Sequence, residues 1–390
     1  MVGCTASRGA LRGGKMRRAL FLVGGVLAGT MLAGSAFAQQ GDGITTPSVL
    51  PPFDPSAARC TVPQGMMPVI AFAKDNTRQF IEGVGYGLKQ AAEDRGLSYA
   101  ESVAKNDAEK QAADVDAFAA AKTGALITAP VDAFGLAPHL QHVIWSGGYV
   151  ATVVPPPATT ILNANQYLTG QTLAVAAVEY IDTELEGRAN VVLLTHDSLQ
   201  FLAPRFVAMR DALKDMPGVR IVADISPATV NEQGGYDTMK LILAANADVD
   251  VVLGADTVVL GALRALREAG KARPDQFLGG IDGEPEAVAE IKRQDSPYKA
   301  SVALSSPVFG YALGAFAADW LEGKSVPQGL DVLPFALTAE NMAQYEADQL
   351  DPGAVYNDPV RRGAYLRMFG NICYDTRDQY LNFPWSSYGQ

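Results

Sequence analysis

The sequence has few of the residues that commonly carry out catalysis and metal binding. Its 390 residues include three cysteines and three histidines. Cys4 lies in an N-terminal segment, which leaves Cys60 and Cys373 for the rest of the chain. Two thiols without a neighbouring histidine do not make a structural zinc site. We therefore expect neither a metal ion nor a cofactor.

Two of the three histidines are placed where catalysis is not favoured. His139 and His142 lie on a predicted helix remote from the strand ends, whereas His196 ends a predicted strand and could approach a site there. No G-x-S-x-G nucleophile elbow accompanies them. Asp256 and Asp282 are an acid pair of the kind that acid–base catalysis uses. Without a nucleophile, however, the sequence favours a binding protein over an enzyme.

Basic residues are also in short supply. The chain has 31 Lys and Arg against 42 Asp and Glu, a net charge of -11. Residues 1–38 contain five of the bases and no acid, so the remainder has a net charge near -16. Nucleic acid and anionic lipid both require a basic face on their partner. We therefore expect neither as a partner.

Long apolar runs are absent after the N-terminus. Residues 15–18 are mostly basic, residues 19–34 are apolar, and Ala36-Phe37-Ala38 matches an A-x-A cleavage site before Gln39. This pattern is typical of a secretory signal peptide. The alternative, a stop-transfer anchor, is disfavoured because glycines break a run that falls short of ~20 residues. We predict that residues 1–38 are removed and that the mature protein is periplasmic, with Met16 as an alternative start.

An exported chain that retains two cysteines is expected to pair them. Cys60 lies just before the first predicted strand, and Cys373 lies near the C-terminus. A disulfide between them would tie the two ends of the chain together. The alternative is two unpaired thiols.

From residue 66 the chain alternates short apolar runs with helical segments. Apolar runs of this kind, separated by helices, are typical of parallel strands covered on both faces. The predicted strands are residues 68–73, 97–101, 125–130, 149–154, 190–196, 219–224, 249–255, 276–282 and 299–304. The fold class is therefore α/β.

Length and composition favour two lobes rather than one core. Prolines at residues 155–157 separate two runs of alternating elements, and both ends of the chain fall outside the alternation. The predicted division is a signal peptide at 1–38, an irregular segment at 39–65, lobe 1 at 66–160 plus 305–335, lobe 2 at 161–304 and a C-terminal wrap at 336–390.

Polar residues follow several strands at the point where each strand ends. In an open parallel sheet, ligands bind beyond the carboxyl ends of the strands. Each residue alone has a plain alternative role as a helix cap or solvated turn, but their clustering favours a binding site. The polar residues at these ends include Lys74, Asp75, Asn76, Arg78, Asp256, Asp282 and Ser305.

Three segments and the order of elements resemble a known family. The segments are "APRFVAMRDAL" at 203–213, "GALRALREAG" at 261–270 and "GIDGEPEAVAEIK" at 280–292. From about residue 66 to about residue 335, the chain resembles the type I periplasmic sugar-binding proteins, the ribose- and galactose-type receptors of ABC transporters. Related repressors begin with a helix-turn-helix, where this chain has the predicted signal peptide.

The resemblance implies two Rossmann-like lobes joined by a three-segment hinge, with a solute held between them. Carboxylates accept hydrogen bonds from sugar hydroxyls, arginine donates in a fixed fork, and aromatic faces pack on the C–H surface of a ring. The positions that match the family's ligand contacts are Asp75, Asn76, Phe80, Arg205, Asp256 and Asp282.

Two positions depart from the family pattern. Val154-Pro155-Pro156 stands where these receptors usually carry an Asp-Arg pair, and Leu304 stands where a polar side chain is common. A larger, less hydroxylated or more anionic solute is therefore expected. Lys74, Arg78 and Arg205 could together face a carboxylate.

The function implied by the resemblance is solute capture by hinge closure, followed by delivery to an ABC transporter permease. A sugar, polyol or sugar-like solute is the first expectation. An anionic organic or aromatic cofactor-like carboxylate is the alternative. A ligand sensor for chemotaxis or signalling is a second alternative role. We expect a monomer.

Overall fold

The computed structural model describes residues 50–152, 157–197, 202–245 and 248–381. All of these residues belong to one structural unit that begins at Ile44. The predicted signal peptide and the departure at Val154-Pro155-Pro156 lie outside the described residues and stay predictions. Among the described residues, no helix is both long and apolar enough to cross a bilayer.

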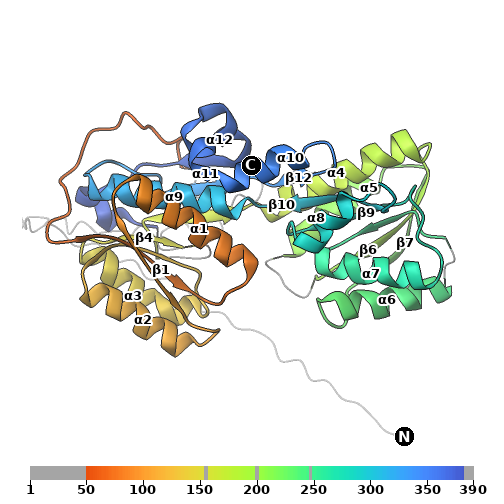
Figure 1. The fold of residues 1–390 in the computed structure, drawn as a ribbon, viewed down its shortest axis with the longest axis horizontal. Coiled ribbons are helices and arrows are strands. Elements are labelled where there is room, and N and C mark those ends of the chain that lie inside the picture. Colours follow the sequence, from red (N-terminus) through yellow and green to blue (C-terminus); the bar gives the residue numbers. More distant parts are fainter. Residues whose placement is uncertain (1–49, 153–156, 198–201, 246–247, 382–390) are drawn as a thin grey trace, which may run out of the picture. The chain divides into compact units, whose positions relative to one another are not determined.

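Two β-sheets with helices on both faces make up the described chain (Figure 1). The first has seven strands in the order β13-β11-β5-β4-β3-β1-β2, and the second has six in the order β12-β10-β9-β8-β6-β7. The edge strands β13 and β12 run antiparallel to their neighbours, whereas the other pairs are parallel. The predicted α/β fold class with two lobes is confirmed.

Alternate residues of β1 point into two different cores of the first sheet. Ile70 and Phe72 enter the core shared with α1 and α9, whereas Ala71 and Ala73 enter the core beneath α2 and α3. The strands are β1 (Met67–Lys74), β2 (Ser98–Val103), β3 (Thr123–Thr128), β4 (Tyr149–Thr152), β5 (Thr160–Ala164), β11 (Gly329–Val332) and β13 (Leu366–Phe369). The helices are α1 (Gln79–Asp94), α2 (Ala108–Ala120), α3 (Ala133–Trp145) and α9 (Ser306–Leu321).

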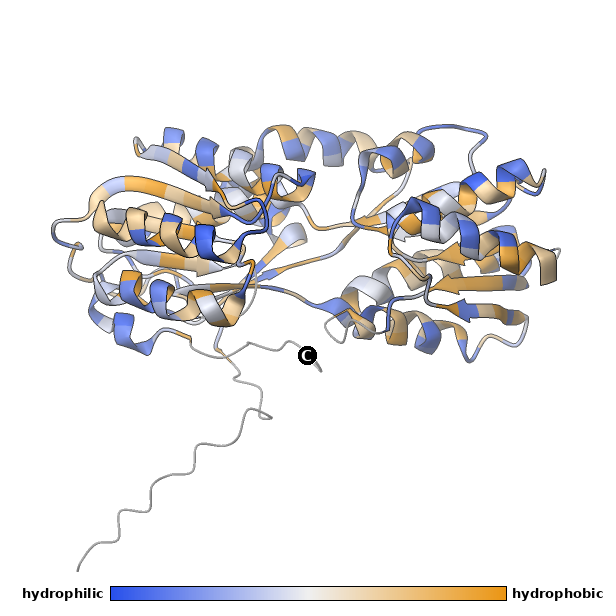
Figure 2. Ribbon diagram, turned by 90° about the horizontal axis from the view of Figure 1, so that it is seen from below, coloured by the Kyte–Doolittle hydropathy of each residue, from blue (hydrophilic) through white to orange (hydrophobic). Residues whose placement is uncertain are grey.

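The second sheet is built in the same way. Val192 and Leu194 of β6 face the core under α6 and α7, whereas Val191 and Leu193 face the core under α4 and α5. Figure 2 shows the resulting apolar strands between helices of mixed hydropathy. The strands are β6 (Ala189–Leu194), β7 (Val219–Ile225), β8 (Val251–Leu253), β9 (Phe277–Ile281), β10 (Tyr298–Ala303) and β12 (Phe335–Leu337). The helices are α4 (Gln166–Glu184), α5 (Ala203–Leu213), α6 (Glu232–Ala245), α7 (Asp256–Glu268) and α8 (Pro285–Ile291).

Within the described residues, the chain passes between the two sheets four times: after β5, after β10, between β11 and β12, and between β12 and β13. The first and third passages differ from the predicted lobe boundaries. β5 at Thr160–Ala164 pairs in the first sheet, although lobe 2 was expected from residue 161. The sequence analysis missed this strand, because its β-branched run is only a few residues long and comes shortly after three prolines.

The C-terminal segment contains regular structure where a wrap was expected. It includes α10 (Met342–Leu350), α11 (Pro352–Asn357), α12 (Pro359–Tyr365), β13 and a 3-10 helix, η1 (Tyr374–Gln379). Asp351 accepts the Ala354 N–H, and Asp358 accepts the Val360 N–H. Both aspartates precede a proline at the first helical position, which is a helix-start signal present in the sequence.

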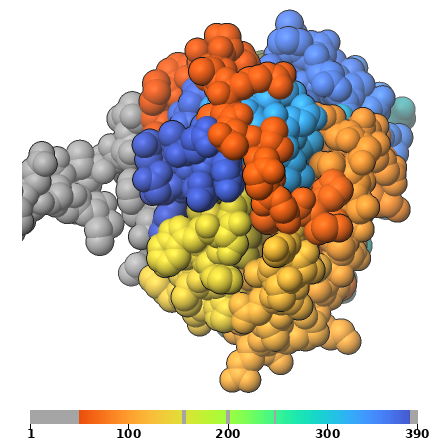
Figure 3. Space-filling model, turned by 90° about the vertical axis from the view of Figure 1, so that its left-hand side faces the viewer, coloured from red at the N-terminus to blue at the C-terminus, as the bar shows by residue number. Residues whose placement is uncertain are grey.

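The N-terminal part of the described chain lies against C-terminal segments (Figure 3). Pro52 forms an isolated antiparallel bridge with Phe369, and the Phe53 N–H donates to the Met368 carbonyl at 3.0 Å. Cys60 and Cys373 form a disulfide in the structure, with Cα atoms 6.2 Å apart. That distance is normal for a disulfide. The bridge would close a loop that contains both sheets, because 313 residues separate the two cysteines.

We predict that the mature protein contains no free thiol. Alkylation of the denatured, unreduced chain beginning at Gln39 should label neither cysteine, whereas prior reduction should expose both. Reduction should lower the free energy of unfolding by about 2–5 kcal/mol, because the unfolded chain loses its cross-link. A Cys60→Ser, Cys373→Ser variant is the control, since its stability should not respond to reductant. Two labelled thiols without reduction would contradict the pairing.

Candidate functional site

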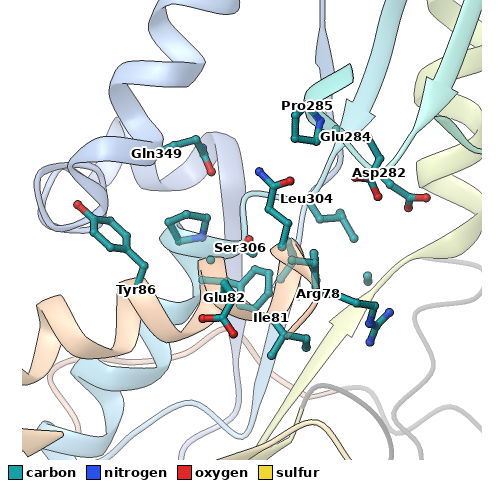
Figure 4. Close-up of a pocket in the computed structure, with 18 of the residues that line it drawn as sticks. Arg78, Ile81, Glu82, Tyr86, Asp282, Glu284, Pro285, Leu304, Ser306 and Gln349 are labelled. Carbon is teal, nitrogen blue, oxygen red and sulfur yellow. The ribbon is translucent and has the colours of Figure 1, made fainter. Parts of the chain in front are cut away.

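A cavity of about 1160 Å³ is lined by residues of both sheets. The first sheet contributes the loop after β1, the loop after β3 and the first two turns of α1. The second sheet contributes the starts of α4 and α5 and the turn after β9 (Figure 4). These are carboxyl ends of parallel strands, where ligands of such sheets bind. The predicted site residues that line this cavity are Asp75, Arg78, Phe80, Arg205 and Asp282.

Arg205 and Asp282 form an ion pair at the wall of the second sheet. Nη1 of Arg205 lies 3.5 Å from Oδ1 of Asp282, and Nε of Arg205 donates to Oε1 of Gln166. The Arg205 side chain is 11% exposed, whereas that of Asp282 is 46% exposed. Burial raises the pKa of Asp282, and the positive charge of Arg205 opposes this shift. Arg205 is therefore fixed by burial and by Gln166, and the more exposed carboxylate of Asp282 lies beside it at the cavity.

Asp256 was predicted to contact ligand, and this prediction is wrong. Asp256 is fully buried and does not line the cavity. Its carboxylate accepts hydrogen bonds from the Tyr298 hydroxyl at 2.7 Å, the Ser301 hydroxyl at 2.7 Å and the Glu284 N–H at 2.8 Å. A Cβ on Gly280 would lie 1.8 Å from Oδ1 of Asp256. The glycine of the "G-I-D-G" segment therefore makes room for this inward carboxylate.

The role of Asp256 is to position the turn that carries Asp282. Asp282 has a φ of 122°, a conformation that costs energy for a residue with a side chain. Asp256 fixes the turn directly through the Glu284 N–H, and Ser301, which donates to Asp256, accepts the Gly283 N–H at 3.1 Å. These bonds hold the backbone of Gly283 and Glu284, the two residues after Asp282. The carboxylate of Asp282 is therefore kept beside Arg205.

Lys74 is a second correction, because it does not reach the cavity. Its side chain is 2% exposed, and Nζ donates to Glu82 at 2.9 Å and to Glu101 at 3.0 Å. Burial alone would lower the pKa of Lys74, but the two carboxylates outweigh burial and raise it. The lysine thus neutralises Glu82, which lines the cavity.

The loop after β1 organises its own side chains. Nη2 of Arg78 lies 2.9 Å from Oδ2 of Asp75, and both residues line the cavity. Asn76 also donates to Asp75 and accepts a hydrogen bond from Arg78. Contrary to the prediction, Asn76 does not line the cavity. Phe80 lines it, and the centroid of its ring lies 5.6 Å from that of Phe309. Asn76 is therefore a support for the loop rather than part of the wall.

Ser305 is likewise absent from the cavity lining, and its neighbour Ser306 takes that place. The Ser305 hydroxyl accepts a hydrogen bond from Nε2 of Gln349 at 2.8 Å. This bond joins the start of α9 to α10, so Ser305 holds the C-terminal helix against the passage after β10.

Several lining residues were missed in the sequence analysis. Gln79, Glu82 and Tyr86 recur at helical spacing along one face of α1, a pattern that was available but has no special meaning without the partner surface. Others come from α10, and the sequence analysis did not predict that this helix lies near the strand ends. The missed residues are Gln79, Glu82, Tyr86, Gln166, Glu284, Lys292, Tyr345, Glu346 and Gln349.

We predict that Asp256→Asn removes a pH dependence of stability. Burial raises the pKa of Asp256 to about 7, whereas the unfolded chain has an ordinary value of about 3.9. Between these values the native state holds a proton that the unfolded state has released, so native stability falls as pH rises. From pH 4.5 to 8, wild type should lose about 3 kcal/mol relative to Asp256→Asn.

Denaturant unfolding at several pH values measures this difference. The matched control is Asp295→Asn, because the side chain of Asp295 is 78% exposed. Its stability should follow that of wild type at every pH. Parallel pH curves for wild type and Asp256→Asn would show that Asp256 stays ionised throughout.

Comparisons with known proteins agree with this geometry. Residues 69–325 match the family described as the periplasmic binding protein domain. The chain is 25% identical over 222 residues to the D-apiose import binding protein of Actinobacillus succinogenes, covering 56% of this chain and 70% of that protein.

Two solved structures share the fold. A periplasmic ribose ABC transporter protein from Conexibacter woesei has a TM-score of 0.64 at 19% identity, covering 73% of this chain and 96% of its own. A solute binding protein from Bacillus halodurans with bound myo-inositol has a TM-score of 0.59 at 21% identity, covering 73% and 99%. Since the family match spans more than half of the sequence and the two-sheet fold agrees with it, this chain belongs to the family of periplasmic binding protein domains.

Proposed function

We propose that the chain is an exported receptor that binds a neutral sugar or polyol and delivers it to the permease of an ABC transporter. The observation that carries this proposal is the pairing of charges in the cavity. Each cation of the cavity lining faces a carboxylate that also lines it. The pairs are Arg78 with Asp75, Arg205 with Asp282, and Lys292 with Glu346.

This pairing favours a neutral solute over the anionic alternative. An anion would need a positive charge that is not already paired, and the lining offers none. Glu284 adds a carboxylate with no ion pair among the described residues, and burial raises its pKa, as do nearby acids. Carboxylates and amides accept hydrogen bonds from hydroxyls, and Phe80 offers an aromatic surface to a ring. A polyhydroxylated ring matches these groups.

The relatives support the same class of solute. One is named for D-apiose import, one structure is named for ribose, and one contains myo-inositol. These are polyhydroxylated and uncharged. Because the identities are 25% or lower, we propose only this class of solute for the chain and no individual sugar.

Capture would proceed by closure around the solute. Residues of both sheets line the cavity, and four passages within the described residues connect the sheets. A solute that contacts both walls binds the closed form more tightly and shifts the population towards it. The closed form would then dock on the permease, or on a receptor of a sensory pathway in the alternative role. Among the residues that the structure describes, the cavity lining contains no histidine or cysteine, and we propose binding without a chemical step.

Export through the segment 1–38 would place the receptor in the periplasm. An oxidising compartment is also where a Cys60–Cys373 bridge would persist.

We predict that Asp282→Asn weakens sugar binding at least tenfold. The change removes the charge from a hydrogen-bond acceptor worth about 1.5–3 kcal/mol. Asparagine tolerates positive φ about as well as aspartate, so the unliganded melting temperature should change little. Thermal-shift titration with D-apiose, D-ribose, D-allose, myo-inositol and common disaccharides measures the loss, and native mass spectrometry identifies any co-purified solute.

Glu286→Gln is the matched control, because Glu286 is exposed beside the same turn and does not line the cavity. It should bind like wild type. If no sugar or polyol stabilises wild type while carboxylates such as glucuronate or benzoate do, the anionic alternative replaces our proposal.

A further inference from the structure

The C-terminal helix α10 forms part of the cavity wall. Tyr345, Glu346 and Gln349 line the cavity, although they lie beyond residue 325, where the family match ends. This wall is therefore an addition to the part of the chain that matches the family. The Tyr345 hydroxyl of this wall lies beside Gly283, the residue that follows Asp282, because a Cβ on Gly283 would lie 3.8 Å from it.

Packing holds α10 in place. The Tyr86 hydroxyl of α1 donates to the Leu350 carbonyl at 2.9 Å. The ring of Tyr345 stacks on that of Phe335, with centroids 5.9 Å apart and planes 14° from parallel. Asp348 accepts a hydrogen bond from the Tyr365 hydroxyl at 2.7 Å. Because these contacts hold the C-terminal end and the buried face of α10, this wall is part of the folded structure.

The cavity extends well beyond the Arg205–Asp282 pair. Arg78 and Tyr86 both line it, and eight helical residues span ~12 Å along the axis of α1. In Figure 4, Arg78 and Asp282 lie at one end of the view, whereas Tyr86 and Gln349 lie at the other. The volume of about 1160 Å³ also exceeds the ~300–1,000 Å³ of pockets that bury a drug-sized ligand. One sugar ring does not fill such a length.

The far end has the chemistry of a second hydroxyl-binding surface. Lys292 of the turn after α8 pairs with Glu346 of α10, and both side chains are 47% exposed. Gln349 is half-buried, and Tyr86 is 45% exposed. Exposed charged pairs and amides exchange hydrogen bonds with water for those with sugar hydroxyls. Val288 and other apolar residues of α8 supply a surface for the C–H side of a ring.

We propose that this far end is a second sugar subsite, so that the receptor takes a neutral disaccharide or a glycoside with two hydroxylated rings. The inference rests on the proposed function. The first ring lies against Arg205 and Asp282, and the second ring lies between α8 and α10. Glu284, on the same turn as Asp282, lines the cavity with a carboxylate that has no ion pair among the described residues, and it is available to accept hydroxyls of the first ring.

The test compares disaccharides with their own monosaccharides. Calorimetric titrations would use cellobiose, maltose, lactose, melibiose and xylobiose against glucose, galactose and xylose. At least one disaccharide should bind tenfold more tightly than its constituent monosaccharides. Glu346→Ala should weaken that disaccharide about tenfold and leave monosaccharide binding within twofold. Lys292→Gln is a second variant of the same subsite and should act alike.

Glu340→Ala is the matched control, since Glu340 is exposed next to α10 and does not line the cavity. It should leave both titrations unchanged. If monosaccharides bind as tightly as every disaccharide, with Asp282→Asn still abolishing binding, the second subsite is wrong and the receptor proposal stands. If no saccharide binds at all, both proposals are overturned. A co-purified solute with the mass of a single pentose or hexose would also refute the second subsite.

Discussion

The geometry of the cavity depends on one buried carboxylate. Asp256 begins α7, yet it turns into the protein and gathers hydrogen bonds from β10 and from the turn after β9. Burying a carboxyl group is costly unless its oxygen atoms are hydrogen-bonded, and here three donors bind them. Because these bonds fix the backbone at Glu284, Asp282 is held with an unfavourable φ beside Arg205. The strained turn is thus supported by the side chains of Asp256, Tyr298 and Ser301, none of which lines the cavity.

Charge pairing is the second organising feature. The chain is strongly acidic, but most acids of the cavity lining, with Glu284 as the exception, are paired with a basic side chain. Lys74 sits behind the wall and binds Glu82, while Arg78 and Arg205 each hold an aspartate. Ion pairs of this kind present oriented oxygen atoms at little net charge. Such a surface suits a solute rich in hydroxyl groups more than it suits an ion.

The C-terminal segment connects the parts of the chain. β12 completes the edge of the second sheet, β13 completes the edge of the first, and α10 lies between them in the sequence. Gln349 of α10 binds Ser305 at the passage after β10, and the rings of Phe335 and Tyr345 stack at the passage before β12. The segment therefore contacts two of the four passages, forms the last one itself, and lines the cavity. A change in α10 would affect the solute and the passages together.

What the sequence determined by itself was local pattern. Apolar runs and helical periodicity predicted nine of the strands and the α/β class, because a buried parallel strand needs apolar residues on both faces. Asp282 was also found from its place at a strand end, whereas Arg205 was found through the resemblance of three segments to periplasmic receptors. The direction of each side chain was decided only by tertiary structure. Asp256 and Lys74 were both predicted to line the cavity. Asp256 instead fills the space beside Gly280, and Lys74 is paired with Glu82 and Glu101 in the protein interior. The α10 wall was equally invisible, because residues far apart in sequence meet there only after the chain has crossed between the sheets for the third time.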